Sequence, residues 1–160
     1  STLPVVLDAD AINILSTHRN WLSRIPKRSI LTPHLGELER LIGKCMDTYE
    51  RLMKVKELAA YLQSYIIVKG AWTCIVTPEG NYYFNPTGNP GMATGGSGDV
   101  LTGILLGLLA QGYEREDACR LGVYVHGLAG NLAAEEKTEI GMTANDIIEA
   151  LPKAWKTLTT

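Results

Sequence analysis

Residues 48–70 read TYERLMKVKELAAYLQSYIIVKG, and this stretch indicates the fold class. Its first part carries apolar residues at three- and four-residue spacing, the pattern of a helix that buries one face: Leu52, Val55, Leu58, Ala59 and Leu62. We therefore expect a helix over Thr48–Ser64. The β-branched, apolar run Tyr65–Val68 that follows predicts a buried strand. A helix that leads directly into a buried strand is typical of α/β proteins with a parallel sheet.

The same alternation extends toward the N-terminus. Short β-branched runs at Val5–Leu7 and Ser29–Thr32 predict two more strands. Helical patterns follow them at Ala9–Leu15 and Leu35–Ile42. This alternating order of three strands and two helices predicts a parallel sheet covered by helices, with right-handed crossovers.

The pattern changes after residue 70. Two short runs, Trp72–Thr77 and Tyr82–Phe84, flank a Pro-Glu-Gly-Asn turn and predict an antiparallel hairpin. The Gly-, Pro- and Asn-rich loop at 85–97 is too long for a simple connection. The rest is predicted to be helical: Asp99–Gln111, about Glu116–Lys137, and a helix after Thr143. Thr143 and Asp146 resemble a capping pair at the start of this last helix. We expect one three-layer α/β/α domain over residues 1–160, with a mainly parallel sheet.

The composition is typical of a globular protein that acts on small molecules or on another protein. Apolar residues make up 46% of the 160 residues and charged residues 20%, and 15 Lys and Arg against 17 Asp and Glu leave a net charge of −2. This balance offers no basic surface for nucleic acid or for an anionic membrane. The most apolar run, Val100–Ala110, is too short to span a bilayer, and no signal peptide is recognised. Three widely spaced cysteines without a metal-ligand pattern favour a reducing, cytoplasmic setting.

The block Gly88–Gly103, GNPGMATGGSGDVLTG, carries the strongest chemical signal. Its closely spaced glycines let several backbone N–H groups point at one spot, and a strongly apolar helix begins directly afterwards. Backbone donors at a helix N-terminus form an anion hole suited to a phosphoryl group, and Asp99 beside it could act as a general base. The simpler interpretation is a glycine-rich loop with a capping Asp. The block is neither a P-loop nor a Rossmann fingerprint, because it lacks GxxxxGK[ST] and GxGxxG.

Polar or glycine residues follow all three predicted parallel strands: Asp8, Asp10 and Asn13; His34 and Glu37; Lys69 and Gly70. Parallel sheets bind ligands at the carboxyl ends of their strands, so these residues could share one site. Each also has a structural explanation. Asp10 could cap a helix, Asp8 could make a turn, Glu37 could cap or orient, and Lys69 with Gly70 could simply end a strand. The full row of polar strand ends favours a ligand site.

Other residues with chemical potential are interpreted as structural. Gly103 and Gly107, four residues apart on a predicted helix, would let a neighbouring element pack closely. His18 and His126 show no pattern that distinguishes them from ordinary structural histidines.

Six segments resemble consecutive blocks of one family: VLDADAINIL, ILTPHLGELERLIG, IIVKGAWT, GNPGMATGGSGDVLTGILLGLLAQGY, VHGLAGNLAAE and GMTANDIIEALP. They are similar, in order and nearly from end to end, to the ADP- or ATP-dependent NAD(P)H-hydrate dehydratases of the ribokinase-like superfamily. The resemblance implies a lyase that repairs hydrated NADH or NADPH, whose ring hydroxyl is phosphorylated and then eliminated as phosphate. Bacterial members use ADP and yield AMP, and the compact motif spacing favours ADP here.

The resemblance also implies residue roles. Asp99 would be the catalytic base and contact the substrate, Gly96, Ser97 and Gly98 would form the anion hole, and His34 would contact the hydrated cofactor. Together with Gly98, five residues would contact the adenine nucleotide: Lys69, Gly70, Ala71, Trp72 and Thr73. Four residues would give support: Asp10, Asn13, Glu37 and Asn89. Magnesium would accompany the nucleotide phosphates, without a dedicated metal cage in the protein.

The resemblance implies that the chain is the C-terminal portion of the family domain. Family members carry further N-terminal strands and helices, including a glycine-rich segment that contacts the hydrated nucleotide. We therefore expect the sheet edge at Val5–Leu7 to be covered by such a segment or by another chain. A homo-oligomer is expected, since family members are often tetramers. Two other functions stay open: a ribokinase-like small-molecule kinase, and a non-catalytic adenine-nucleotide-binding fragment.

Overall fold

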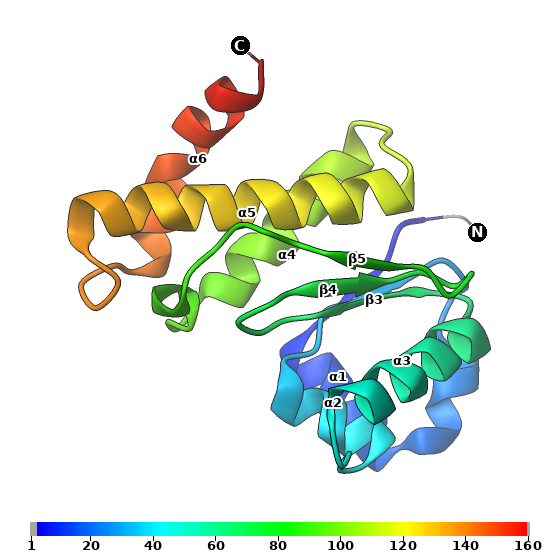
Figure 1. The fold of residues 1–160 in the computed structure, drawn as a ribbon. Helices are drawn as coiled ribbons and strands as arrows, with labels where there is room; N and C mark the ends of the chain where they lie inside the picture. Colours follow the sequence, from blue (N-terminus) through cyan, green and yellow to red (C-terminus); the bar gives the residue numbers. More distant parts are fainter. Residues whose placement is uncertain (1–2, 160) are drawn as a thin grey trace.

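The computed structural model describes residues 3–159, in which five strands form one mixed sheet (Figure 1). The strand order is β1–β2–β3–β4–β5. As predicted, the first three strands are parallel and the last two continue the sheet as an antiparallel hairpin. The strands are β1 (Val6–Leu7), β2 (Ile30–Leu31), β3 (Tyr65–Val68), β4 (Cys74–Val76) and β5 (Tyr82–Phe84).

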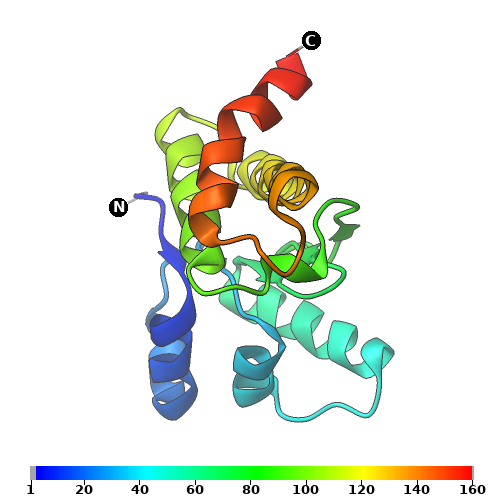
Figure 2. The same cartoon turned by 90° about the vertical axis from the view of Figure 1, so that its left-hand side faces the viewer.

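Helices cover both faces of the sheet, which confirms the predicted three-layer architecture (Figures 1 and 2). One face is covered by α1 (Ala9–Thr17), α2 (Leu35–Ile42) and α3 (Thr48–Leu62), and the other by α4 (Ser97–Ala110), α5 (Arg115–Lys137) and α6 (Ala144–Thr159). Successive strand residues point to opposite faces, so each strand contributes to both cores. Ile30 and Ile67 pack under α4–α6, whereas Leu31 and Ile66 pack against α1–α3.

Most helix bounds follow the sequence pattern. α2 begins and ends as predicted, and the Thr143–Asp146 pair caps α6: the Asp146 carboxylate accepts from the Thr143 amide at 2.8 Å, and the Thr143 hydroxyl accepts from the Asp146 amide at 3.3 Å. A 3₁₀ helix, η1 (Arg19–Arg24), was not predicted. The strand predicted from Trp72 begins only at Cys74, because the β3–β4 pairing starts with Val68 opposite Cys74. No helix within residues 3–159 has the length and apolar character needed to cross a membrane.

Residues 85–94, here called the strap, connect β5 to α4 and lie along α5. They include a short 3₁₀ helix, η2 (Pro90–Met92). The Thr87 hydroxyl donates to the Tyr124 carbonyl at 2.9 Å, and the Asn89 amide nitrogen donates to the Gly130 carbonyl at 3.1 Å. The predicted long loop is therefore fixed to α5 by side-chain hydrogen bonds to helix carbonyls.

Glycines on α5 allow this close packing, whereas the two glycines predicted to serve that purpose do not. A Cβ built on Gly127 would lie 2.2 Å from the Thr87 hydroxyl oxygen and 2.7 Å from its carbonyl carbon. Gly103 and Gly107 of α4 have nothing within 4 Å of a built Cβ among the described residues, so the packing role predicted for them is wrong there. Both are exposed to solvent.

These two glycine environments predict opposite effects of the same substitution. Gly127→Ala is expected to lower the free energy of unfolding by about 1–3 kcal/mol, because the strap backbone must move away from α5. Gly107→Ala, the matched control, is expected to raise it by about 0.5–1 kcal/mol, since alanine is the better helix former at an open site. Urea unfolding of the two variants checks both. Equal effects would contradict the assigned packing of the strap.

Candidate active site

A cavity of about 610 Å³ lies where the strap, the carboxyl ends of β2 and β3, the start of α4 and the middle of α5 meet. Eight of the predicted site residues line it: His34, Lys69, Gly70, Ala71, Thr73, Asn89, Ser97 and Gly98. They come from segments far apart in the sequence. The structure therefore brings together the polar ends of the second and third strands with the glycine-rich block.

Lys69 and His34 emerge side by side because the pairing of β2 and β3 continues past the strand ends. The Lys69 amide donates to the Pro33 carbonyl at 2.9 Å, and His34 and Lys69 form an isolated parallel bridge. Both residues therefore leave the sheet at the same edge, which is where parallel sheets bind their ligands.

The Lys69 ammonium lies over the first turn of α4. A Cβ built on Gly98 would be 3.0 Å from Lys69 Nζ, so a larger residue at position 98 would require the ammonium group to shift. The Ser97 amide donates to the Thr94 carbonyl at 3.2 Å, while the amides of Gly98 and Asp99 have no backbone acceptor among residues 3–159. A cation next to the positive end of a helix is unfavourable unless an anion lies between them. This arrangement fits a phosphate group.

The His34 ring is held by Glu37 in a capping box at the start of α2. The Glu37 amide donates to His34 Nδ1 at 3.2 Å, and the His34 amide donates to Glu37 Oε1 at 3.0 Å. Because Nδ1 accepts, the neutral ring carries its proton on Nε2. Glu37 is buried and lies outside the cavity, and its Oε1 is 3.6 Å from His34 Nε2, beyond hydrogen-bond distance. It therefore orients the ring and leaves Nε2 able to donate to a ligand.

Asp99, Gly96 and Trp72 lie outside the cavity lining. Asp99 is exposed in the first turn of α4, directly after Gly98, so its carboxylate is accessible from the solvent side of the anion site. Gly96 occupies the N-cap position with a φ of 88°, a left-handed conformation that favours glycine. The Trp72 side chain is 74% exposed on the β3–β4 loop.

The residues after β1 do not reach the cavity. α1 begins at Ala9, so the structural alternative that Asp10 caps this helix does not hold: Asp8 occupies the N-cap position, and Asp10 lies exposed in the first turn. Asp8 instead accepts from the Thr102 hydroxyl at 2.7 Å, which ties β1 to α4. Asn13 accepts a hydrogen bond from Arg40 between α1 and α2. The geometry gives Asp10 and Asn13 no connection to the cavity.

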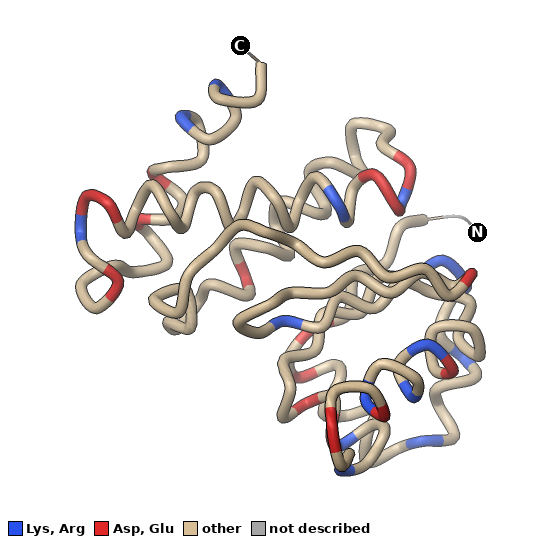
Figure 3. Tube along the Cα trace, in the orientation of Figure 1, with Lys and Arg blue, Asp and Glu red and all other residues tan. Residues whose placement is uncertain are grey.

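His126 was interpreted as structural, yet the structure places it in the cavity wall. Its Nε2 lies 3.3 Å from Ser97 Oγ. Burial, which outweighs an opposing hydrogen bond with the Ser97 backbone, and the nearby Lys69 charge lower the pKa of His126 to about 4, so the ring is neutral at physiological pH. One signal could have identified it: α5 carries charged residues only toward its two ends (Figure 3). Its uncharged middle lines the cavity through Val123, His126 and Gly127.

The low pKa of His126 predicts acid sensitivity. The unfolded chain takes up a proton near the ordinary value of 6.5 and the folded protein only near about 4, so stability is lost as the pH falls through that window. Between about pH 7 and about pH 5 the loss from this group is expected to be about 2 kcal/mol. His126→Gln should remove that part of the pH dependence in urea unfolding, whereas His18→Gln on the surface should not. Identical pH dependence in the wild type and His126→Gln would contradict a buried, neutral His126.

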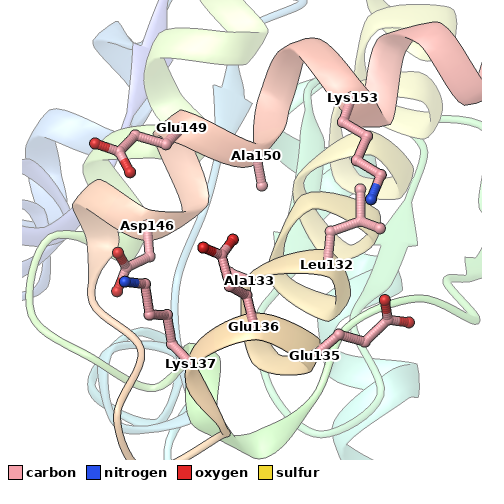
Figure 4. A pocket seen from close by; sticks show the side chains of 9 residues that line it. All are labelled: Leu132, Ala133, Glu135, Glu136, Lys137, Asp146, Glu149, Ala150 and Lys153. Carbon is pink, nitrogen blue, oxygen red and sulfur yellow. The ribbon is translucent and has the colours of Figure 1, made fainter.

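A second hollow of about 340 Å³ lies between α5 and α6 (Figure 4). Its charged lining comprises Glu135, Glu136, Lys137, Asp146, Glu149 and Lys153. Asp146 already caps α6, and no group of three or more His, Cys, Asp or Glu within residues 3–159 could hold a metal ion. The candidate site is therefore the larger cavity at the start of α4.

Comparison with known proteins identifies the family. Residues 1–153 match the sequence model of a family described as NAD(P)H-hydrate dehydratase. The chain belongs to this family. A bifunctional NAD(P)H-hydrate repair enzyme of Thermofilum pendens is 43% identical over 97% of this chain and 30% of that protein. An ADP-dependent (S)-NAD(P)H-hydrate dehydratase of Bacillus subtilis is 39% identical over 96% of this chain and 54% of that protein.

Solved structures agree with this assignment and confirm the ribokinase-like fold. An ADP/ATP-dependent NAD(P)H-hydrate dehydratase from Bacillus subtilis, co-crystallised with ATP/Mg²⁺, superposes with a TM-score of 0.82 at 37% identity, covering 98% of this chain and 56% of that one. A ribokinase-like superfamily protein from Enterococcus faecalis gives a TM-score of 0.79 at 34% identity, covering 95% and 52%. This chain thus spans between about a third and just over half of the length of these relatives.

Proposed function

We propose that the chain carries the phosphoryl-transfer site of an ADP- or ATP-dependent NAD(P)H-hydrate dehydratase, and that residues 1–160 are the C-terminal portion of its domain. The observation that carries this proposal is the position of Lys69 Nζ over the first turn of α4, in the lining of the cavity. Membership of the dehydratase family supports the choice of reaction. Hydrated NADH or NADPH is the proposed substrate, and ADP the proposed phosphoryl donor.

The proposed roles are those that the family resemblance implies, and the positions of the residues around the cavity support them. The loop from Lys69 to Thr73, with Gly98, contacts the nucleotide, and the Lys69 ammonium neutralises phosphate charge. The first turn of α4, with Gly96, Ser97 and Gly98, holds the phosphoryl group that is transferred. His34 donates from Nε2 to the hydrated cofactor, with Glu37 holding its ring. Asn89 supports the cavity wall through its bonds to α5.

The proposed reaction has two steps. In the first step, Asp99 accepts the proton of the ring hydroxyl. The hydroxyl oxygen attacks the terminal phosphorus of ADP, and the bond from this phosphorus to the oxygen of the leaving AMP breaks. The C–O bond of the ring then breaks and phosphate leaves, while the neighbouring carbon gives up a proton to water. The electrons of that C–H bond form the double bond of NADH. Phosphorylation is needed because hydroxide is a poor leaving group, while phosphate is a good one.

Magnesium is proposed to accompany the nucleotide. The described residues offer no cluster of His, Cys, Asp or Glu for a metal, so the ion would be held mainly by phosphate oxygens and water. When bound, it would neutralise charge on the phosphates.

The proposal also includes location and assembly. We place the protein in the cytoplasm and expect it to form a homo-oligomer, with the free edge of β1 covered by another segment or chain. Sizing by light scattering tests the assembly.

The reaction is tested by incubating the protein with hydrated NADH, ADP and Mg²⁺. We expect NADH absorbance to return, with one AMP and one phosphate formed per NADH. A phosphorylated product that accumulates without NADH would indicate a kinase. Nucleotide binding without any turnover would contradict the proposed activity of this chain.

A further inference from the structure

His126 and Lys69 line the same cavity, and His126 reaches the start of α4 from α5. It lies on α5 with Val123 and Gly127, which line the same cavity three residues before it and one after. Its Nε2 is 3.3 Å from the hydroxyl oxygen of Ser97, the first residue of α4. The strap and α4 both pack on this part of α5, so the ring is carried by a rigid element.

We propose that His126 is a positioning residue that orients the Ser97 hydroxyl toward the phosphoryl group. In this arrangement His126 Nε2–H donates to Ser97 Oγ, and the Ser97 hydroxyl proton donates to a phosphoryl oxygen. The inference rests on the proposed function for the identity of the anion. It adds the Ser97 hydroxyl as a hydrogen-bond donor to the backbone N–H groups of the glycine-rich block.

The direction of this hydrogen-bond chain follows from the charges around it. The ring is neutral, so it carries one proton and can either donate to or accept from Ser97. If Nε2 accepted, the serine proton would be used up and its lone pairs would face the bound anion. If Nε2 donates, every dipole in the chain points its positive end at the anion, in the same sense as Lys69 and the start of α4.

The serine backbone explains why its hydroxyl matters. The Ser97 amide donates to the Thr94 carbonyl, so this residue cannot offer its N–H to the ligand. Its hydroxyl is the remaining donor, and a hydroxyl rotates freely unless a neighbour fixes it. His126 is the neighbour that the structure provides.

A double-mutant cycle tests the proposal. The variants are His126→Leu, which removes the donor, and His126→Gln, which can keep an N–H near the position of Nε2, each alone and combined with Ser97→Ala. Calorimetry measures the Kd of ADP and of adenosine, and steady-state kinetics measures kcat and KM. We expect His126→Leu to weaken ADP binding or lower kcat by about tenfold to a hundredfold, the range for a hydrogen bond to a charged group. Adenosine affinity should not change.

Two further results are expected. His126→Gln should recover most of the loss, and His126→Leu should have no additional effect in the Ser97→Ala background. His18→Leu, at the surface, serves as the control. Equal losses in the Leu and Gln variants, additive losses with Ser97→Ala, or an equal loss of adenosine affinity would each overturn the proposal. If ADP binding follows the expected pattern but hydrated NADH is never converted, the proposed reaction fails while the role of His126 stands.

Discussion

Replacing Asp99 with Asn is expected to lower kcat for conversion of hydrated NADH by about a hundredfold to ten-thousandfold, the usual contribution of a general base. The amide cannot accept the hydroxyl proton, whereas the shape of the first turn of α4 is retained. ADP affinity should change little, since the exposed carboxylate lies outside the cavity lining. Loss of one acidic group from a helix N-terminus should lower stability by less than about 1 kcal/mol.

Asp117→Asn is the matched control for this prediction. Asp117 is also an exposed aspartate in the first turn of a helix, but it lies at the start of α5, outside the lining of the cavity. Its variant should keep the kcat of the wild type. A kcat within about threefold of wild type for Asp99→Asn would remove Asp99 from the role of general base, because that change is far below the expected range.

Replacing Lys69 with Met is expected to lower kcat/KM for ADP by about a hundredfold to a thousandfold, since a preorganised charge at the phosphate is lost. The ligand-free protein should lose no stability, because the lysine lies against the positive end of α4 and its removal relieves that repulsion. This combination separates a binding group from a structural one. Adenosine affinity should remain close to that of the wild type.

Calorimetry with ADP and adenosine, together with thermal unfolding, measures these effects. Lys44→Met, at an exposed position between α2 and α3, is the control for removal of a positive charge. If Lys69→Met unfolded at a clearly lower temperature and bound ADP normally, the lysine would be a structural residue.

Much of the fold could be predicted from local patterns. The bounds of α2 and β3 follow from the spacing of apolar residues, and the capping pair of α6 from Thr143 and Asp146. These signals are local, because helix periodicity and caps depend on residues three or four apart. The 3₁₀ helix η1 gave no such signal. Its sequence contains Trp21 and Leu22 without an extended repeat.

The site was predictable only in part. Convergence of His34 and Lys69 follows from parallel topology, which sends the strand ends to one edge. His126 could not be placed in this way, because its role depends on how α5 crosses the sheet and on how closely the strap packs at Gly127. Asp10 lay in the same row of strand ends, but the start of α1 at Ala9 turns it toward solvent.

The central claim is that the first turn of α4 and Lys69 together bind the transferred phosphoryl group. Titration of the ¹⁵N-labelled protein with ADP and with adenosine tests it directly, because an amide that binds phosphate changes its chemical shift. ADP is expected to shift the amide signals of Gly98 and Asp99 strongly, adenosine is expected to leave them nearly unchanged, and Lys69→Met should abolish the ADP effect at the same concentration. Equal shifts with ADP and adenosine, or ADP shifts confined to other parts of the molecule, would contradict the assignment of this site.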